Sequence, residues 1–292
     1  MAEAVAARRI RTRRPLQARG IRVAGALAVL EYCARVYRRN WRGTLFMTFI
    51  SPILFLGAMG FGLGTLVNTT SAAGSGATTG VSATGGELAM FGYAAFLAPG
   101  LLIATSMQTG GFEATYPIMG RLVWDKVYHA MLATPIRVVD ILAGQLGWFG
   151  VRLTLVASAY FVVMVGFGLI HGGPLAVLLV PIGVLTGLCF STWIAAFAAT
   201  QRNDVGFSMV FRFLITPLFL FSGTFFPIER LPAFLQPVAF VTPTYHGVAL
   251  ARDLSLGTAQ LAPSLVHLAV LLGFVGLGIP AAYYTFRRAM VK

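Results

Sequence analysis

The stretch that decides the fold class is LAVLLVPIGVLTGLCFSTWIAAFAAT, residues 175–200, which contains no charged side chain over its 26 residues. At a rise of about 1.5 Å per residue, about 20 apolar residues suffice for a helix to cross the hydrocarbon core of a bilayer. A strand of a lipid-facing barrel would instead alternate polar and apolar residues over about ten positions. This stretch therefore predicts a membrane-spanning α-helix.

Other stretches of similar length and composition are found at residues 44–67, 88–112, 141–170, 205–226 and 265–284. Across all 292 residues, 57% are hydrophobic and 11% are charged. The mean hydropathy of +0.79 is higher than that of ordinary soluble domains. We therefore expect an all-α membrane protein in which residues 43–292 form one domain with six transmembrane helices.

The basic residues predict the orientation, because Lys and Arg stay preferentially on the cytoplasmic side. Eleven of the 22 precede residue 44, and only Arg230 and Arg252 fall in predicted outer segments. With an even number of spans, both termini are expected in the cytoplasm, and the Arg-rich composition suggests a bacterial inner membrane. The net charge of +13 favours anionic membrane lipids as partners. A nucleic-acid partner is not expected, because no DNA-binding motif accompanies the arginines.

The segment before the first span divides into two parts. Residues 1–20 are basic but lack the apolar core and cleavage site of a secretory signal, so we expect a disordered cytoplasmic tail. Residues 21–42 have the periodicity of an amphipathic helix lying in the headgroup layer, with an ordinary solvated helix as the alternative. Its charged face contains Glu31, Arg35, Arg38, Arg39 and Arg42, and its other face contains Val29, Tyr32, Cys33, Val36 and Trp41.

The chain lacks the residue patterns of a catalytic or metal site. Its histidines, His129, His171, His246 and His267, are spread over different segments, and Cys33 and Cys189 have no metal-ligand spacing. Snorkelling and helix capping explain the charged residues near the inner ends of the spans, which are Glu113, Asp140, Arg152 and Arg212. Because no phosphate-binding Gly-rich loop with Gly-Lys-Ser/Thr is present, neither a cofactor nor an ATPase site is expected in this chain.

The longest predicted inner loop, residues 120–148, is where a partner that hydrolyses ATP could act. Within it, residues 122–132 have the spacing of a short helix that ends before Pro135. Its apolar side presents Trp124, Tyr128 and Leu132, and its polar side presents Arg121, Asp125, Lys126 and His129.

The segment FSGTFFPIERLPAFLQPVAFVTP, residues 221–243, follows the fifth apolar stretch and contains four prolines. Irregular backbone at membrane depth must be buried in protein or line a water-filled cavity. Two interpretations remain open from the residues alone. Either residues 228–240 form short helices that re-enter the outer leaflet, or the segment lies flat in the headgroups.

Two stretches carry a resemblance to a known family. The first has Arg121 and Asp125 four residues apart and runs on into MLATPIRVVDILAGQLGW, residues 131–148. The second is FSGTFFPIERLPAFLQPVAFVTPTYHGVALAR, residues 221–252. In these stretches and in its six spans the chain resembles an ABC-2 type transport permease, near the branch of nodulation lipo-oligosaccharide and antibiotic-resistance exporters.

The resemblance implies a half-transporter that pairs with a second copy or a paralogous permease and with two ATPase subunits, which would bind ATP and Mg²⁺. The implied cargo is hydrophobic or lipid-linked. A secondary transporter, or a membrane-embedded enzyme acting on a lipid-linked substrate, is the alternative. The resemblance assigns ATPase coupling to Arg121, Trp124, Asp125, Lys126, Tyr128, His129 and Leu132. It also favours the re-entrant form, with a substrate path or gate at Phe221, Ser222, Gly223, Phe226, Pro227, Pro232, Pro243 and Tyr245.

Overall fold

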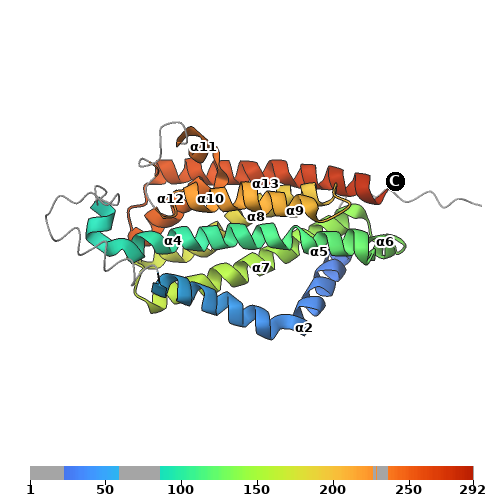
Figure 1. Cartoon of the computed structure of the whole chain (residues 1–292), viewed down its shortest axis with the longest axis horizontal. Helices are drawn as coiled ribbons and strands as arrows, with labels where there is room; N and C mark the ends of the chain where they lie inside the picture. The colour runs from blue at the N-terminus through green and yellow to red at the C-terminus, as the bar shows by residue number, and fades with distance from the viewer. Residues whose placement is uncertain (1–22, 59–85, 226–227, 229–235, 292) are drawn as a thin grey trace, which may run out of the picture.

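The computed structural model describes residues 23–58, 86–225, 228 and 236–291 (Figure 1). Within these ranges the regular structure is entirely helical, which confirms the predicted all-α class. The predicted tail, 1–20, lies outside the described residues. So do three of the expected gate residues, Phe226, Pro227 and Pro232.

Five long helices and several short ones make up the described chain. The long helices are α2 (Val23–Phe55), α4 (Gly86–Glu113), α7 (Val138–Gly166), α8 (Leu179–Ala198) and α13 (Leu261–Met290). The short elements are α5 (Tyr116–Met119), η2 (Gly120–Trp124), α6 (Val127–Leu132), η3 (Gly173–Leu178), α9 (Val205–Val210), η4 (Phe211–Ile215), α10 (Thr216–Phe221), α11 (Gln236–Val241) and α12 (Pro243–Leu256).

Four of the predicted spans overlap helices that are long and apolar enough to cross a membrane: Trp41–Ala58, Val138–Gly166, Gly173–Ala198 and Leu261–Met290. The last part of the first predicted span, residues 59–67, lies outside the described residues. The fifth predicted span is a shorter apolar helix, Val205–Phe221. The second predicted span falls in α4, which is interrupted at Gly92, where φ is 79°. Thus the described chain has six apolar helical segments at the predicted places, and four of them meet the length and composition of a span.

The long helices α4, α7, α8 and α13 run side by side along the molecule, and α2, which bends sharply in its middle, lies at the edge opposite α13 (Figure 1). Between them, α8 packs against α4, α7 and α13, while α2 packs mainly against α7. The segment α5–η2–α6 lies at one end, called here the α6 end, near the C-terminal end of α13. The opposite end, called here the α12 end, contains α12, a helix that the hydropathy pattern does not predict (Figure 1).

The amphipathic segment and the described part of the first predicted span both belong to α2, which bends sharply in its middle (Figure 1). In its first part Val29 and Cys33 are buried, whereas the charged face from Glu31 to Arg42 is exposed. Trp41 is also exposed, as expected for an aromatic residue at a bilayer surface. Whether this part lies in the headgroup layer stays a prediction.

Small residues allow α8 to approach its neighbours closely. A Cβ added to Gly183 would lie 2.7 Å from Leu102 of α4, and one added to Gly187 would overlap Leu153 of α7. A Cβ added to Gly110 of α4 would likewise overlap the backbone carbonyl oxygen of Gly187. Packing of backbones through glycines spaced four apart is typical of helices that associate inside membranes.

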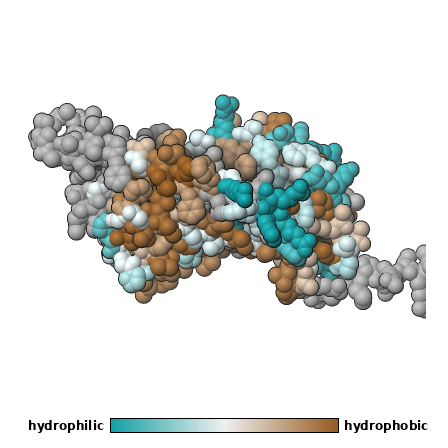
Figure 2. Space-filling view, turned by 90° about the horizontal axis from the view of Figure 1, so that it is seen from below, coloured by the Kyte–Doolittle hydropathy of each residue, from teal (hydrophilic) through white to brown (hydrophobic). Residues whose placement is uncertain are grey.

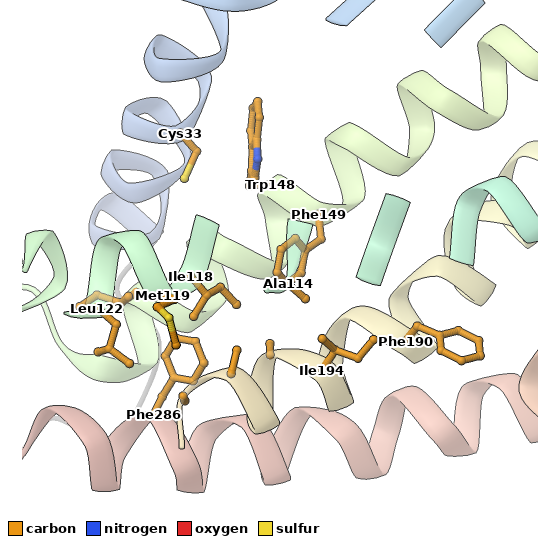
Figure 3. Packing of buried hydrophobic residues seen from close by; sticks show 14 of the residues in the cluster. Cys33, Ala114, Ile118, Met119, Leu122, Trp148, Phe149, Phe190, Ile194 and Phe286 are labelled. Carbon is orange, nitrogen blue, oxygen red and sulfur yellow. The ribbon is translucent and has the colours of Figure 1, made fainter. Parts of the chain in front are cut away.

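The hydrophobic core has two main parts, one toward each end of the bundle. The part at the α6 end is shown in Figure 3, where Cys33 and Trp148 lie above Ile118, Met119 and Phe286. These side chains come from α2, α7, α5 and α13. The core therefore ties the loop elements to the long helices.

The surface is also apolar over much of its area. Hydrophobic side chains cover much of the face seen in Figure 2, and hydrophilic ones gather mainly toward the α6 end. Large exposed apolar residues on the long helices include Val162, Leu272 and Leu277, each more than half exposed. An apolar belt with a polar end is the surface of a protein embedded in a bilayer.

Candidate functional site

The loop at the α6 end is not the single helix predicted for residues 122–132. A π-helical turn, η2, ends at Trp124, and α6 begins only at Val127. Between them Lys126 adopts left-handed backbone angles, with φ of 52° and ψ of 27°. The single-helix prediction is wrong because this conformation, which is disfavoured for residues with a Cβ, interrupts the helix.

Four of the predicted coupling residues form an exposed edge on this segment. Trp124 is 57% exposed, and Asp125, Lys126 and His129 are exposed as well. A large exposed aromatic side chain between charged groups is characteristic of a protein contact surface. We call Trp124, Asp125, Lys126 and His129 the exposed edge; Leu132, another predicted coupling residue, is half-buried behind it.

The other two predicted coupling residues point inward and meet one amide, in what we call the amide cluster. Arg121 Nη1 and Tyr128 Oη donate to Oε1 of Gln145, a residue of α7, at 2.6 and 3.0 Å. Cys33 of α2 places its Sγ 3.8 Å from the same oxygen. All four residues are buried, so Arg121 and Tyr128 attach the loop to α7 and are not surface anchors.

The protonation state of this cluster follows from its burial. Burial raises the pKa of Tyr128 to about 12, against the opposing effect of the Arg121 charge. Burial likewise raises the pKa of the Cys33 thiol. Both groups are therefore neutral donors at physiological pH. Gln145 Nε2 is buried without a hydrogen-bond partner among the described residues.

A second buried polar group, the ion-pair cluster, joins α2, α4 and α7. Arg152 Nε donates to Glu113 Oε1 at 2.8 Å, and Trp148 Nε1 donates to Glu113 Oε2 at 3.3 Å. Arg152 also donates to the Tyr37 hydroxyl at 3.1 Å, and its guanidinium lies 4.7 Å from the centre of the Tyr37 ring. Tyr37 and Trp148 pack edge to face.

This arrangement corrects part of the sequence interpretation. Arg152 does not snorkel to water, because it is buried and paired with Glu113. Of the two explanations offered for these charged residues, capping applies to Asp140, since its Oδ2 accepts a hydrogen bond from the Arg137 N–H at the start of α7. Arg212 is exposed, as snorkelling requires.

At the α12 end, the residues that follow α10 form a buried turn. Ser222 and Thr224 are buried, and their hydroxyl oxygens lie 2.9 Å apart. Gly223 between them has a φ of 84°, a left-handed angle that glycine adopts without strain. Its carbonyl accepts a hydrogen bond of 2.7 Å from Arg252 of α12, whose guanidinium lies 3.7 Å from the centre of the Phe96 ring. Phe221, just before the turn, is 41% exposed.

Beyond this turn, the predicted gate residues Pro243 and Tyr245 lie in the first turn of α12. Pro243 occupies the first position of the helix, where its missing N–H costs nothing. The Tyr245 ring packs edge to face on Phe240 of α11 and contacts both His246 and His267. The Nδ1 atoms of these two histidines lie 2.7 Å apart. His246 and His267 do lie in different segments, α12 and α13, but the fold brings their rings together. Within the described ranges, no group of three or more metal-ligating side chains is present.

Several residues of these sites were missed by reasoning from sequence. Gln145 is a single amide in an apolar run, and nothing in its spacing indicates a hydrogen-bonding role. His246 and His267 lie 21 residues apart, and Arg252 and Gly223 lie 29 apart. Arg252 carried two signals: it ends the second stretch of family resemblance, and it is a basic residue in a predicted outer segment.

Comparison with known proteins assigns the family. The family model for the ABC-2 type transporter matches residues 26–256. Nodulation protein J of Rhizobium leguminosarum bv. trifolii is 30% identical over 229 residues, which are 76% of this chain and 80% of that protein. Its counterpart from Rhizobium leguminosarum bv. viciae is 27% identical over 264 residues, covering 88% of this chain and 94% of that protein. Because the family model matches most of the chain, including the exposed edge, both buried clusters and the turn at Gly223, the chain belongs to the ABC-2 type transporter family.

Proposed function

We propose that this chain is the membrane subunit of an ATP-driven exporter, and that a separate ATPase subunit, in two copies, binds ATP and Mg²⁺ and drives it. The permease unit would contain two membrane subunits, either two copies of this chain or this chain and a paralogue. Family membership supports the division of labour between a transport subunit and an ATPase. The observation that carries the proposal is the exposed edge on a loop that two residues anchor to α7 from inside.

The exposed edge suits an ATPase contact for a mechanical reason. Trp124 and Asp125 are free to enter a partner, while Arg121 and Tyr128 in the same segment donate to the buried Gln145 amide. A displacement of the edge would therefore be transmitted to α7 through short hydrogen bonds. A flexible surface loop without such bonds would yield under the same force.

Binding of the ATPase can be tested with matched substitutions. We expect Trp124→Ala and Asp125→Ala each to weaken capture of the co-expressed ATPase about thirtyfold, since a hot-spot residue contributes about 2 kcal/mol or more. The measurements are ATPase retention on the purified tagged permease, and substrate-stimulated ATP hydrolysis. Asp204→Ala is the control, because Asp204 is an exposed acid outside the loop. Unchanged capture, or transport by the chain alone under a proton gradient, would contradict the proposal.

We further propose six spans in a bacterial inner membrane, with the α6 end and both termini in the cytoplasm. The interrupted α4 and the short α9–η4–α10 unit would then cross with the four longer helices. The segment from α10 to α12 would re-enter the outer leaflet as a gate. Two features support this: α11 is helical and packs through Phe240 on Tyr245, and Arg252 binds the Gly223 carbonyl at the base of the segment.

Thiol labelling in intact cells tests this arrangement, starting from a chain in which Cys33 and Cys189 are replaced. A cysteine at exposed Ala259, after α12, should react quickly with a membrane-impermeant maleimide, and one at Thr134 only after permeabilisation. Cysteines at Val238 and Val241 of α11 should react at least about tenfold more slowly than at Ala259, because thiolates do not form in hydrocarbon. Fast labelling at both Val238 and Val241 would show a flat outer loop.

The proposed cargo is a hydrophobic or lipid-linked compound, with lipo-oligosaccharides and antibiotics as the classes to compare. A groove of about 630 Å³ at the α12 end supports this choice, because its lining is almost entirely apolar. The groove lies between α8, α12 and α13 and is lined by Leu178, Leu250, Leu254, Leu265 and Leu268, among others. The ATPase assay above, run with hydrophobic drugs and with lipid-linked glycans, distinguishes the two classes.

A further inference from the structure

A basic pocket of about 590 Å³ lies at the α6 end, where three elements meet. Lys126 and His129 come from the loop, Arg202 follows α8, and Arg288 lies near the end of α13. We call the hollow lined by these four residues the basic pocket. Its volume is within the range of about 300–1,000 Å³ that is typical of small-molecule sites.

The cations of the basic pocket are not neutralised within the described part of the chain. No Asp or Glu lines the pocket. The ion pairs found among the described residues, Arg35 with Glu31 and Arg152 with Glu113, involve none of its cations. Three like charges that converge from separate elements repel one another unless an anion lies between them. The missing counter-charge therefore points to an anionic ligand.

The position of the pocket along α13 indicates which kind of anion. Tyr284 and Arg288 both line it and are one helical turn apart, at the end of the apolar run of α13. Tyrosine and then arginine at the end of an apolar helix mark the level of the lipid headgroups. The remaining lining includes the apolar side chains of Leu122, Val123 and Ala289. Such a mixed lining matches a molecule with a charged head and an apolar body.

The threonine hydroxyl groups in the pocket do not compete with the cations for this role. Thr200 Oγ1 donates to the Phe197 carbonyl, and Thr285 Oγ1 donates to carbonyls of its own helix. Their protons are thus already used within helices. Donors for an anion remain on Lys126, Arg202 and Arg288, since guanidinium and ammonium groups have several N–H bonds each.

We propose that the basic pocket binds the headgroup phosphate of an anionic phospholipid from the adjacent leaflet. Basic pockets between helices on the inner side of membrane proteins bind such headgroups. A phospholipid fits better than an acidic surface of a partner protein, because the pocket lies at the membrane boundary and has apolar walls. Lys126, with its left-handed backbone, is the N-cap of α6 and lines the pocket. Lipid occupancy would then hold the loop against α13.

The test uses the purified full chain without any ATPase, so it does not depend on the proposed exporter function. The probes are dioctanoyl phosphatidylglycerol, dioctanoyl phosphatidylcholine and inorganic phosphate, with binding measured by native mass spectrometry and by titration in detergent. Wild type should bind phosphatidylglycerol at least about tenfold more tightly than phosphatidylcholine. Because a basic residue contributes about 1 kcal/mol to anionic-lipid binding, Arg202→Ala and Arg288→Ala should each weaken that affinity about fivefold.

Arg287→Ala is the matched control, because Arg287 is the exposed neighbour of Arg288 and does not line the pocket. It removes the same charge and should change the affinity less than about twofold. Arg288→Gln, which keeps more of the side-chain length, should behave as Arg288→Ala does if the charge is what matters.

Three results would overturn the proposal. One is equal weakening by Arg287→Ala and Arg288→Ala, which would show a diffuse surface effect. Another is equal affinity for phosphatidylcholine, or binding of inorganic phosphate as tight as that of the lipid. The third is unchanged lipid binding by both Arg202→Ala and Arg288→Ala, which would show that the pocket cations do not hold the headgroup.

Discussion

Replacing Arg152 by alanine is expected to lower the free energy of unfolding by about 3–5 kcal/mol, the cost of leaving one partner of a buried ion pair unpaired. The side chains of Arg152 and Glu113 are only 9% and 14% exposed. Without the guanidinium, the Glu113 carboxylate keeps only the longer hydrogen bond from Trp148. Tyr37 also loses both its hydrogen bond and its stacked cation. Denaturant unfolding in mixed micelles, followed by circular dichroism, measures the change.

Two companion variants separate the ion pair from a general loss of charge. Arg212→Ala removes an exposed arginine of η4 and should change stability by less than about 0.5 kcal/mol. The double variant Glu113→Gln/Arg152→Met removes both charges and should recover most of the loss, because an apolar or neutral replacement of a buried pair is often tolerated. If Arg152→Ala and Arg212→Ala had the same stability, the buried pair would have no structural role.

Gln145→Leu is expected to destabilise the chain by about 3 kcal/mol, because it leaves a buried hydroxyl and a buried guanidinium without their acceptor. Tyr128 is fully buried and Arg121 is 8% exposed, so water cannot easily replace the lost amide oxygen. The substitution is also expected to reduce substrate-stimulated ATP hydrolysis in the presence of the ATPase, since it separates the loop from α7. Both the unfolding free energy and the stimulated rate are measured.

Gln145→Glu serves as the rescue variant. A carboxylate offers two acceptor oxygens to Arg121 and Tyr128, and it removes the Nε2 donor that has no partner in the described structure. Stability should therefore be closer to wild type than that of Gln145→Leu. Should Gln145→Leu prove as stable and as active as wild type, the amide cluster would not connect the loop to α7.

The fold class could be predicted from the sequence because it depends on composition and on run length. Residues 175–200 contain no charge, and the structure places a 3₁₀ turn and α8 there. The coupling loop shows the limit of this reasoning. Its amphipathic spacing favoured one helix. The left-handed backbone at Lys126 depends on how η2 and α6 pack against α7, and the local sequence pattern does not indicate that packing.

The internal contacts of the site were less predictable for a related reason. Capping, one of the two explanations offered for the charged residues at the inner ends, applies to Asp140 and depends only on neighbours within three residues. Arg152 pairs with Glu113, 39 residues away, and Arg121 and Tyr128 meet an amide on another helix. Such pairs depend on which helix faces are in contact. Residue spacing along one segment contains no information about them.

The position of Cys33 and Tyr37 on α2 has a consequence for how that helix sits in the membrane. The two residues are one turn apart on the same side of α2, and each contacts a different buried cluster. A rotation of α2 by a single residue, about 100°, would remove both contacts at once. These two buried contacts therefore fix the rotation of α2 about its own axis. They hold its arginine-rich face outward independently of any lipid headgroup.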